Sequence, residues 1–273
     1  PSHHRERRCL MESRSMGCGM AAEPDPAEFQ SGARLESTAT AESAEYVAAC
    51  DGPVWLQSEA SRRLVGRMGP RGRAEFERWR RCWEPQQDGS ACALASAVAA
   101  LRFLDAPGAA SWNQSRIYHE VVRPRGLFTL GISLDNGAEM LRALGAGDLS
   151  VEVRCISEIE STAATLRADL REAFGEGRSS TCCLVANYKR WVGGSGGHWS
   201  PIGGWAEAED MVLILDVNPS KCAPHWVPVA HLAAALSLRN TITRKPRGYV
   251  FLRQAEVADA RAEARACGDP RGV

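Results

Sequence analysis

Four residues whose side chains could perform acyl transfer follow one another along the chain. Cys92 opens an apolar stretch of helical spacing, His198 follows a glycine-rich loop, and Asp216 ends a run of five hydrophobic residues. Gln86 precedes Cys92 by six positions in a polar segment. A thiol nucleophile, an imidazole base and a carboxylate that orients the base make up an enzyme that forms an acyl-enzyme intermediate. No other part of the sequence suggests a reaction.

Cys92 is predicted to be the first residue of a helix whose buried face carries Leu94, Val98, Leu101 and Leu104. A thiol at that position meets free backbone N–H groups and the positive end of the helix dipole, and both stabilise a thiolate. We therefore expect a lowered pKa for the Cys92 thiol. The alternative from position alone is a small buried core residue, the commoner environment of a lone cysteine.

His198 follows residues 193–197, of which four are glycines. Glycines leave a cleft wall without side chains, so a histidine that starts the next strand can reach Cys92 and act as its base. A structural histidine is the alternative. A phosphate-binding loop is disfavoured because the glycines do not match G-x-G-x-x-G and lead into a strand rather than a helix.

Asp216 lies eighteen residues after His198, a separation that suits two neighbouring antiparallel strands joined by a turn at 207–210. A buried carboxylate needs a partner, and an imidazole N–H supplies one; a turn aspartate before Asn218 is the alternative. Gln86 could donate its side-chain amide to an oxyanion, but Gln87 stands beside it and a single glutamine is a weak signal.

The elements that must position these residues follow from hydrophobic spacing and capping signals. We predict helices at 59–68 with Ser58 as the N-cap, at 73–83, from Cys92 until Pro107, after Ser133 as far as Gly145, at 159–174 and at 229–238. Predicted strands are 151–153, 182–187, 198–203, 211–217 and 249–252. Helices that precede most of the strands indicate an α+β fold.

Taken together, these segments resemble the phytochelatin synthase family. The match is most specific in residues 194–205 around His198 and in residues 210–217 around Asp216. It extends to residues 224–228 and to Arg247 at the start of the last strand, and it covers roughly residues 55–252. The resemblance implies a papain-like fold, with an N-terminal helical lobe carrying Cys92 and a C-terminal antiparallel-sheet lobe carrying His198 and Asp216.

The same resemblance implies a reaction and roles for the site residues. Cys92, His198 and Asp216 would form the triad, and Gln86 would donate to the oxyanion. The reaction would move γ-glutamylcysteine from one glutathione to a second glutathione, with release of glycine. Glutathione would be both donor and acceptor, no cofactor would be covalently bound, and cadmium or zinc would act as activator or as a glutathione thiolate complex. Contacts to substrate are expected from three residues, Tyr188, Lys221 and Arg247.

Three departures from the family pattern bear on this expectation. Ala93 follows the cysteine where the family usually has glycine, and its methyl group would narrow the pocket. Pro219 stands where the family usually carries an arginine, so Lys221 is the nearest cation and cannot supply a bidentate clamp. The cysteine-rich extension of plant relatives is represented only by Cys267 in the tail. A hydrolase of glutathione or its conjugates, and a non-enzymatic thiol- or metal-binding protein, therefore remain as alternatives.

Composition narrows the class of protein. Formal net charge is zero, which does not favour nucleic acid or an anionic membrane as a partner, and no apolar run approaches the roughly 20 residues of a membrane helix. The ten cysteines are irregularly spaced without a C-x-x-C pair, so we expect reduced thiols and no metal site. Cytoplasmic location is expected, with a plastid or other organelle as the alternative, and a homodimer is left open.

The chain divides into three parts by composition. Residues 1–50 lack a sustained apolar period and are interpreted as a disordered leader. Residues 51–253 form the expected catalytic domain, and residues 254–273 form a polar, alanine-rich tail.

Overall fold

The computed structural model describes residues 52–128, 131–177, 181–192, 194 and 196–255. The proposed leader and nearly all of the proposed tail lie outside these residues. No helix in the described ranges combines the length and the apolar character that crossing a bilayer requires. All six cysteines within the described ranges are free thiols: Cys82, Cys92, Cys155, Cys182, Cys183 and Cys222.

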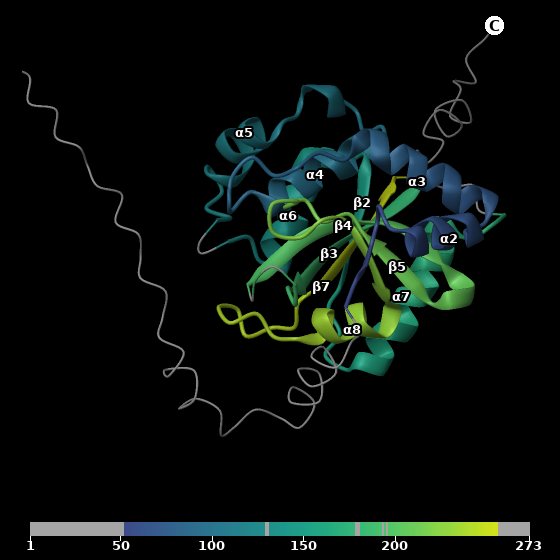
Figure 1. Cartoon of the computed structure of the whole chain (residues 1–273). Helices are drawn as coiled ribbons and strands as arrows, with labels where there is room; N and C mark the ends of the chain where they lie inside the picture. The colour runs from purple at the N-terminus through teal and green to yellow at the C-terminus, as the bar shows by residue number, and fades with distance from the viewer. Residues whose placement is uncertain (1–51, 129–130, 178–180, 193, 195, 256–273) are drawn as a thin grey trace, which may run out of the picture. The chain divides into compact units, whose positions relative to one another are not determined.

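One antiparallel sheet forms the centre of the described part of the chain (Figure 1). Its seven strands lie in the order β1-β6-β5-β4-β3-β7-β2, and every neighbouring pair is antiparallel. The strands are β1 (Val54–Trp55), β2 (Leu149–Arg154), β3 (Cys182–Lys189), β4 (Gly197–Ala206), β5 (Met211–Ile214), β6 (His225–Pro228) and β7 (Gly248–Gln254).

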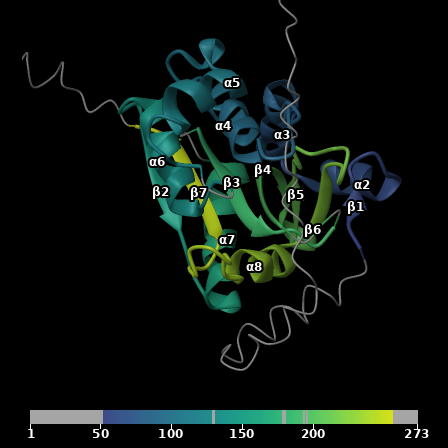
Figure 2. The ribbon, with the colours of Figure 1, turned by 90° about the vertical axis from the view of Figure 1, so that its left-hand side faces the viewer.

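Helices cover both faces of this sheet. In Figure 2, α4, α5 and α6 lie on one side of the sheet, and α7 and α8 lie on the other. The helices are α2 (Glu59–Arg67), α3 (Pro70–Cys82), α4 (Cys92–Phe103), α5 (Gln114–Ile117), α6 (Leu134–Gly145), α7 (Ile159–Phe174) and α8 (Val229–Ser237). Short helical turns add Ala109–Ser111, the π-helical Tyr118–Val122 and Glu207–Glu209.

The prediction of an α+β fold is confirmed. The predicted first residues of two helices are also confirmed, and in both helices a serine side chain caps the start. Ser58 accepts a hydrogen bond from the Ser61 amide, and Ser133 accepts one from the Asn136 amide. The predicted start of the second helix was wrong, because α3 begins at Pro70, where the missing N–H removes no helical hydrogen bond. Strands β1 and β6 and helix α5 were missed.

Helix α4 holds Cys92 in place through its packing. Ten of its twelve residues are buried, including Val98 and Leu101, so the helix contacts core on nearly all sides. It packs against β3 and β4, the strands that lead into and out of the glycine-rich loop. A helix buried in this way cannot tilt without disturbing the core, and the thiol at its first residue is therefore fixed against β4.

Gly248 is expected to be the most sensitive glycine of the sheet. Its φ is +126°, and a Cβ at this position would overlap the carbonyl oxygen of Arg154 on β2. We expect Gly248→Ala to lower the free energy of unfolding by about 3 kcal/mol, because strain and overlap add. Urea denaturation measures this change. The matched control is Gly66→Ala in exposed α2, where nothing lies near the added methyl and stability should rise by about 1 kcal/mol. Equal effects of the two substitutions would contradict this account of Gly248.

Candidate active site

Cys92 is the first residue of α4 and lies beside the strand that carries His198. The N–H of Trp199, the residue after His198, and the N–H of Ala93 both donate hydrogen bonds to the sulfur. No side chain caps this helix end, so its first amides are available to an incoming oxyanion. Burial nevertheless raises the pKa of the Cys92 thiol, although both amides and the charge of Arg190 oppose it. The expected lowering of this pKa by the helix end was wrong for the site without substrate.

His198 and Asp216 form a buried pair. The imidazole Nε2 lies 2.8 Å from Oδ1 of Asp216, and both residues are almost fully excluded from solvent. Burial is the largest influence on the pKa of His198 and lowers it overall, although the hydrogen bond and the charge of Asp216 oppose it. The charges of Arg190 and Lys221 contribute smaller lowerings. At neutral pH the imidazole is therefore uncharged. With Nε2–H donated to Asp216, Nδ1 keeps its lone pair and can accept a proton.

Besides His198 and Arg190, two further donors hold the Asp216 carboxylate. The Asn218 amide donates to Oδ1 at 2.8 Å, and the Tyr188 hydroxyl donates to Oδ2 at 3.3 Å. Burial by itself raises the pKa of Asp216, but His198, Arg190 and the Asn218 amide lower it overall. The carboxylate is therefore ionised and fixed, as a group that orients an imidazole must be.

Arg190 is the residue of this site that sequence reasoning missed. It follows β3, and its amide donates to the carbonyl of Gly196 in the opposite loop. Its Nη2 lies 2.8 and 2.9 Å from the two Asp216 oxygens and 2.6 Å from His198 Nε2. One feature of the sequence could have indicated this residue. If the strands on either side of the glycine-rich loop pair as a hairpin with Lys189 opposite Gly197, position 190 lies beside the glycines that precede His198.

A cavity of about 660 Å³ opens at Cys92. This volume is in the range of small-molecule sites and can accept a tripeptide. Its wall combines the glycine-rich loop, the start of α6 and the segment before β7. The lining residues that carry polar side chains are Ser90, Cys92, Ser133, Asn136, Asn187, Trp199, Asn240, Thr241, Thr243 and Arg247.

Arg247 supplies the positive charge of this cavity. The residue is 5% exposed, its Nη1 lies 3.5 Å from the Asn187 side-chain oxygen, and Cys92 is near enough to influence its pKa. A Cβ at Gly197 would overlap the guanidinium, so the glycine directly before His198 leaves room for this arginine in its present position. A buried guanidinium at the edge of a cavity is suited to binding a carboxylate.

The other residues singled out in the sequence take different positions. Gln86 donates its side-chain amide to the Asp88 carbonyl, while its side-chain oxygen is buried without a partner among the described residues. Tyr188 is fully buried against Asp216 and does not line the cavity. Lys221 is exposed and acts on the site through its charge near His198. Ala93 is buried in the core and does not line the cavity, so its methyl group does not narrow it.

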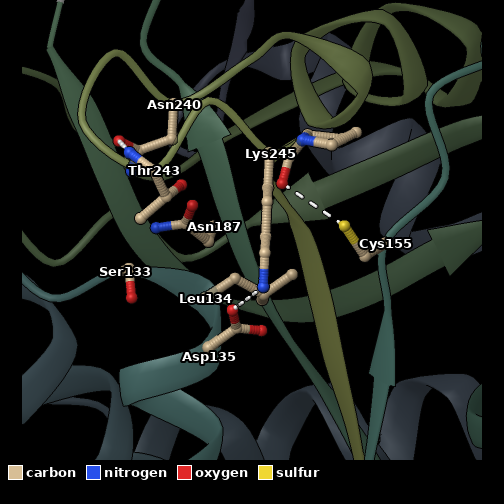
Figure 3. Close-up of a pocket in the computed structure, with 9 residues that line it drawn as sticks. Ser133, Leu134, Asp135, Cys155, Asn187, Asn240, Thr243 and Lys245 are labelled. Atoms are coloured by element: carbon tan, nitrogen blue, oxygen red, sulfur yellow. Dashed lines mark hydrogen bonds and ion pairs between the residues drawn. The ribbon is translucent and has the colours of Figure 1, made fainter.

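Two smaller cavities adjoin the one at Cys92. The cavity in Figure 3, beside the Lys245–Asp135 ion pair and Cys155, measures about 10 Å³ and has room for no more than a water molecule. The second measures about 360 Å³ and shares Ser90 and Phe128 with the main cavity. No group of three or more histidine, cysteine, aspartate or glutamate side chains within the described residues could hold a metal ion.

The two buried histidines His225 and His231 allow a prediction of how the free energy of unfolding changes as the pH falls. Burial lowers the pKa of His231 to about 4 and also lowers the pKa of His225. The unfolded chain binds these protons near pH 6.5, so stability should fall between pH 6.5 and 4, by about 3 kcal/mol for His231. We expect His231→Gln to flatten that slope in urea titrations at several pH values. The exposed His119→Gln should leave the slope unchanged; an unaltered slope in His231→Gln would contradict the prediction.

Comparisons with known proteins identify the family of this chain. The family model described as phytochelatin synthase matches residues 51–249. Three curated relatives are each named glutathione gamma-glutamylcysteinyltransferase 1. They come from Arabidopsis thaliana (41% identity over 76 residues), Lotus japonicus (38% over 76) and Triticum aestivum (36% over 92). The alignments cover 27–33% of this chain and 15–18% of the relatives' length. Because the family model matches well over half of the chain, the protein belongs to the phytochelatin synthase family.

Proposed function

We propose that the chain is a thiol acyltransferase that moves the γ-glutamylcysteine unit of glutathione to a second glutathione and releases glycine. The observation that carries the proposal is the site itself. Cys92 opens onto a 660 Å³ cavity containing Arg247. His198, which is paired with the buried Asp216, lies on β4, the strand whose Trp199 amide contacts the sulfur. The name of the three relatives, glutathione gamma-glutamylcysteinyltransferase, describes the same transfer.

The first half-reaction transfers the acyl group to the enzyme. Nδ1 of His198 takes the proton from the Cys92 thiol, and the sulfur attacks the carbonyl carbon of the cysteinyl–glycine peptide bond. The oxyanion forms next to the uncapped amides of α4, with Gln86 as the proposed side-chain donor. When the C–N bond breaks, His198 returns the proton to the glycine amine and a thioester remains on Cys92.

The second half-reaction regenerates the thiol. The free amine of a second glutathione attacks the thioester carbon, the C–S bond breaks, and the proton of the amine passes through His198 to the Cys92 sulfur. The adjoining 360 Å³ cavity, which shares Ser90 and Phe128 with the first, is the space from which this acceptor can approach. Attack by water in place of the amine would give hydrolysis.

The arrangement we propose is papain-like, with a helical lobe around α4 and a sheet lobe around β4. Arg247 and Asn187 would bind the donor, and Lys221 would contribute charge at the entrance. Heavy-metal ions such as cadmium would enter as thiolate complexes of glutathione, presented as the acceptor. These assignments rest on the cavity's lining residues and on membership of the family.

The test is product analysis by mass spectrometry of the full chain incubated with glutathione, with and without cadmium. Peptides with repeated γ-glutamylcysteine units that require Cys92 would support the transferase. Glycine and γ-glutamylcysteine alone would replace it with the hydrolase. Absence of any product that depends on Cys92, together with metal binding that survives Cys92→Ala, would favour the non-enzymatic alternative.

A further inference from the structure

We propose that Arg190 is a positioning residue of the triad, which fixes the Asp216 carboxylate and holds a permanent positive charge against the imidazole of His198. This inference rests on the proposed function, because it assigns a role within the same reaction. Arg190 is 6% exposed and lies at the end of β3, directly beside the hairpin that carries His198. It does not line the cavity, so it acts through the triad rather than on substrate.

One nitrogen of Arg190 meets both other members of the charged pair. Nη2 lies 2.8 and 2.9 Å from the two oxygens of Asp216 and 2.6 Å from Nε2 of His198. Nε2 of His198 itself lies 2.8 Å from Oδ1 of Asp216. A base at Nδ1 requires that Nε2 carry the proton and donate it to the Asp216 carboxylate. In this tautomer the guanidinium of Arg190 donates to the same carboxylate. It cannot hydrogen-bond to the adjacent Nε2–H of His198, because both groups are donors.

This contact has a definite electrostatic consequence. A proton added to His198 places a second positive charge within 2.6 Å of a guanidinium that is always protonated. The same guanidinium favours an anion at Cys92. Arg190 therefore disfavours the charged form of the base and favours the charged form of the nucleophile. Asp216 alone would do the opposite to His198, because a carboxylate stabilises imidazolium.

The other charged and titratable groups around the pair do not replace Arg190. Lys221 is exposed and contributes a smaller lowering of the pKa of His198. The neighbours that face the pair come from β3, from α4, from the loop after β5 and from β6. They are Tyr188, Cys92, Lys221, Cys222 and His225. Arg247, in the segment before β7, interacts with Cys92. Within the described residues, Arg190 is the only cationic side chain hydrogen-bonded to Asp216.

The arrangement suits expulsion of an amine. The glycine amine is a poor leaving group unless its nitrogen is protonated, and His198 supplies that proton. An imidazolium placed against a guanidinium gives up that proton more readily than one paired only with a carboxylate. Arg190 thus favours transfer of the proton from His198 to the leaving amine. Its hydrogen bonds to Asp216 fix the carboxylate that in turn orients the imidazole ring through Nε2.

The test measures the pH dependence of Cys92 alkylation by iodoacetamide, followed by peptide mass spectrometry, so that it does not depend on glutathione turnover. Wild type, Arg190→Gln and Arg190→Lys are compared, with circular dichroism to establish folding. The matched control is Arg167→Gln, which removes another arginine that binds an aspartate through two hydrogen bonds, at Asp210 on the surface.

Loss of the charge should move the alkylation profile of Arg190→Gln to higher pH by about one unit. Arg190→Lys, which keeps a charge but not the planar contact, should move it by less, and Arg167→Gln should not move it. In the glutathione reaction, both limbs of the kcat/KM profile of Arg190→Gln should shift upward. If folded Arg190→Gln and Arg190→Lys both keep the wild-type alkylation profile, the role proposed for Arg190 is overturned. If these variants also retain turnover of glutathione, the proposed function of the chain is unaffected by that result. Should Arg190→Gln fail to fold, the shift in Arg190→Lys alone decides.

Discussion

Replacement of Cys92 by alanine is expected to lower the rate of glycine release from glutathione by about 1,000-fold or more. Among the described residues that line the 660 Å³ cavity, Cys92 is the only nucleophile that has a histidine base on the adjoining strand. Removing the nucleophile of a triad leaves only the contribution of binding and of the oxyanion donors. A coupled assay for free glycine, run at saturating glutathione, measures the change.

The control for this substitution is Cys155→Ser. Cys155 is an exposed thiol whose sulfur lies 3.4 Å from the Pro246 carbonyl, and it does not line the main cavity. Its replacement should leave glycine release unchanged. Equal loss of activity in the two variants, or full activity in Cys92→Ala, would show that the reaction does not pass through Cys92.

Asp216→Asn is expected to damage both activity and stability. The neutral amide no longer compensates the buried guanidinium of Arg190, and removal of one member of a buried ion pair costs about 3 kcal/mol. It also fails to fix the Nε2–H form of His198, so turnover should fall on the order of 10²–10⁴-fold. Urea denaturation and the glycine assay give the two quantities.

Asp210→Asn is the matched substitution outside the site. Asp210 pairs with Arg167 at the surface and has a φ of +53°, a conformation that asparagine tolerates as well as aspartate. Its loss should change stability by less than about 1 kcal/mol and should not alter turnover. An Asp216→Asn variant as stable and active as Asp210→Asn would remove the basis for the buried charge network.

Local sequence signals were sufficient for much of this fold. Ser58 and Ser133 cap helices because their hydroxyl groups satisfy amides three residues later, an interaction that depends on near neighbours alone. Cys92 could be placed at a helix start because the apolar period begins there. Strand β6 and the two-residue β1 were missed because their pairing with each other depends on contacts distant in the sequence.

The site was less predictable than the fold. Order along the chain identified Cys92, His198 and Asp216 as candidates, but nothing local indicates that Arg190 binds Asp216, because that contact arises only when the hairpin of β3 and β4 forms. The expected lowering of the Cys92 pKa considered the helix end and not the burial that opposes it. Tyr188 was expected at the substrate, whereas its place beneath Asp216 depends on the side to which β3 turns that residue.

The most direct measurement of the central claim is a rapid-quench experiment on the full chain with glutathione, analysed for free glycine and for the mass of the Cys92 peptide. If Cys92 forms the thioester, glycine should appear in a burst that approaches one equivalent per enzyme when deacylation is slower than acylation. The Cys92 peptide should then gain the mass of one γ-glutamylcysteine unit. Acyl modification on another cysteine, or turnover in which the Cys92 peptide never gains that mass at any quench time, would contradict the account.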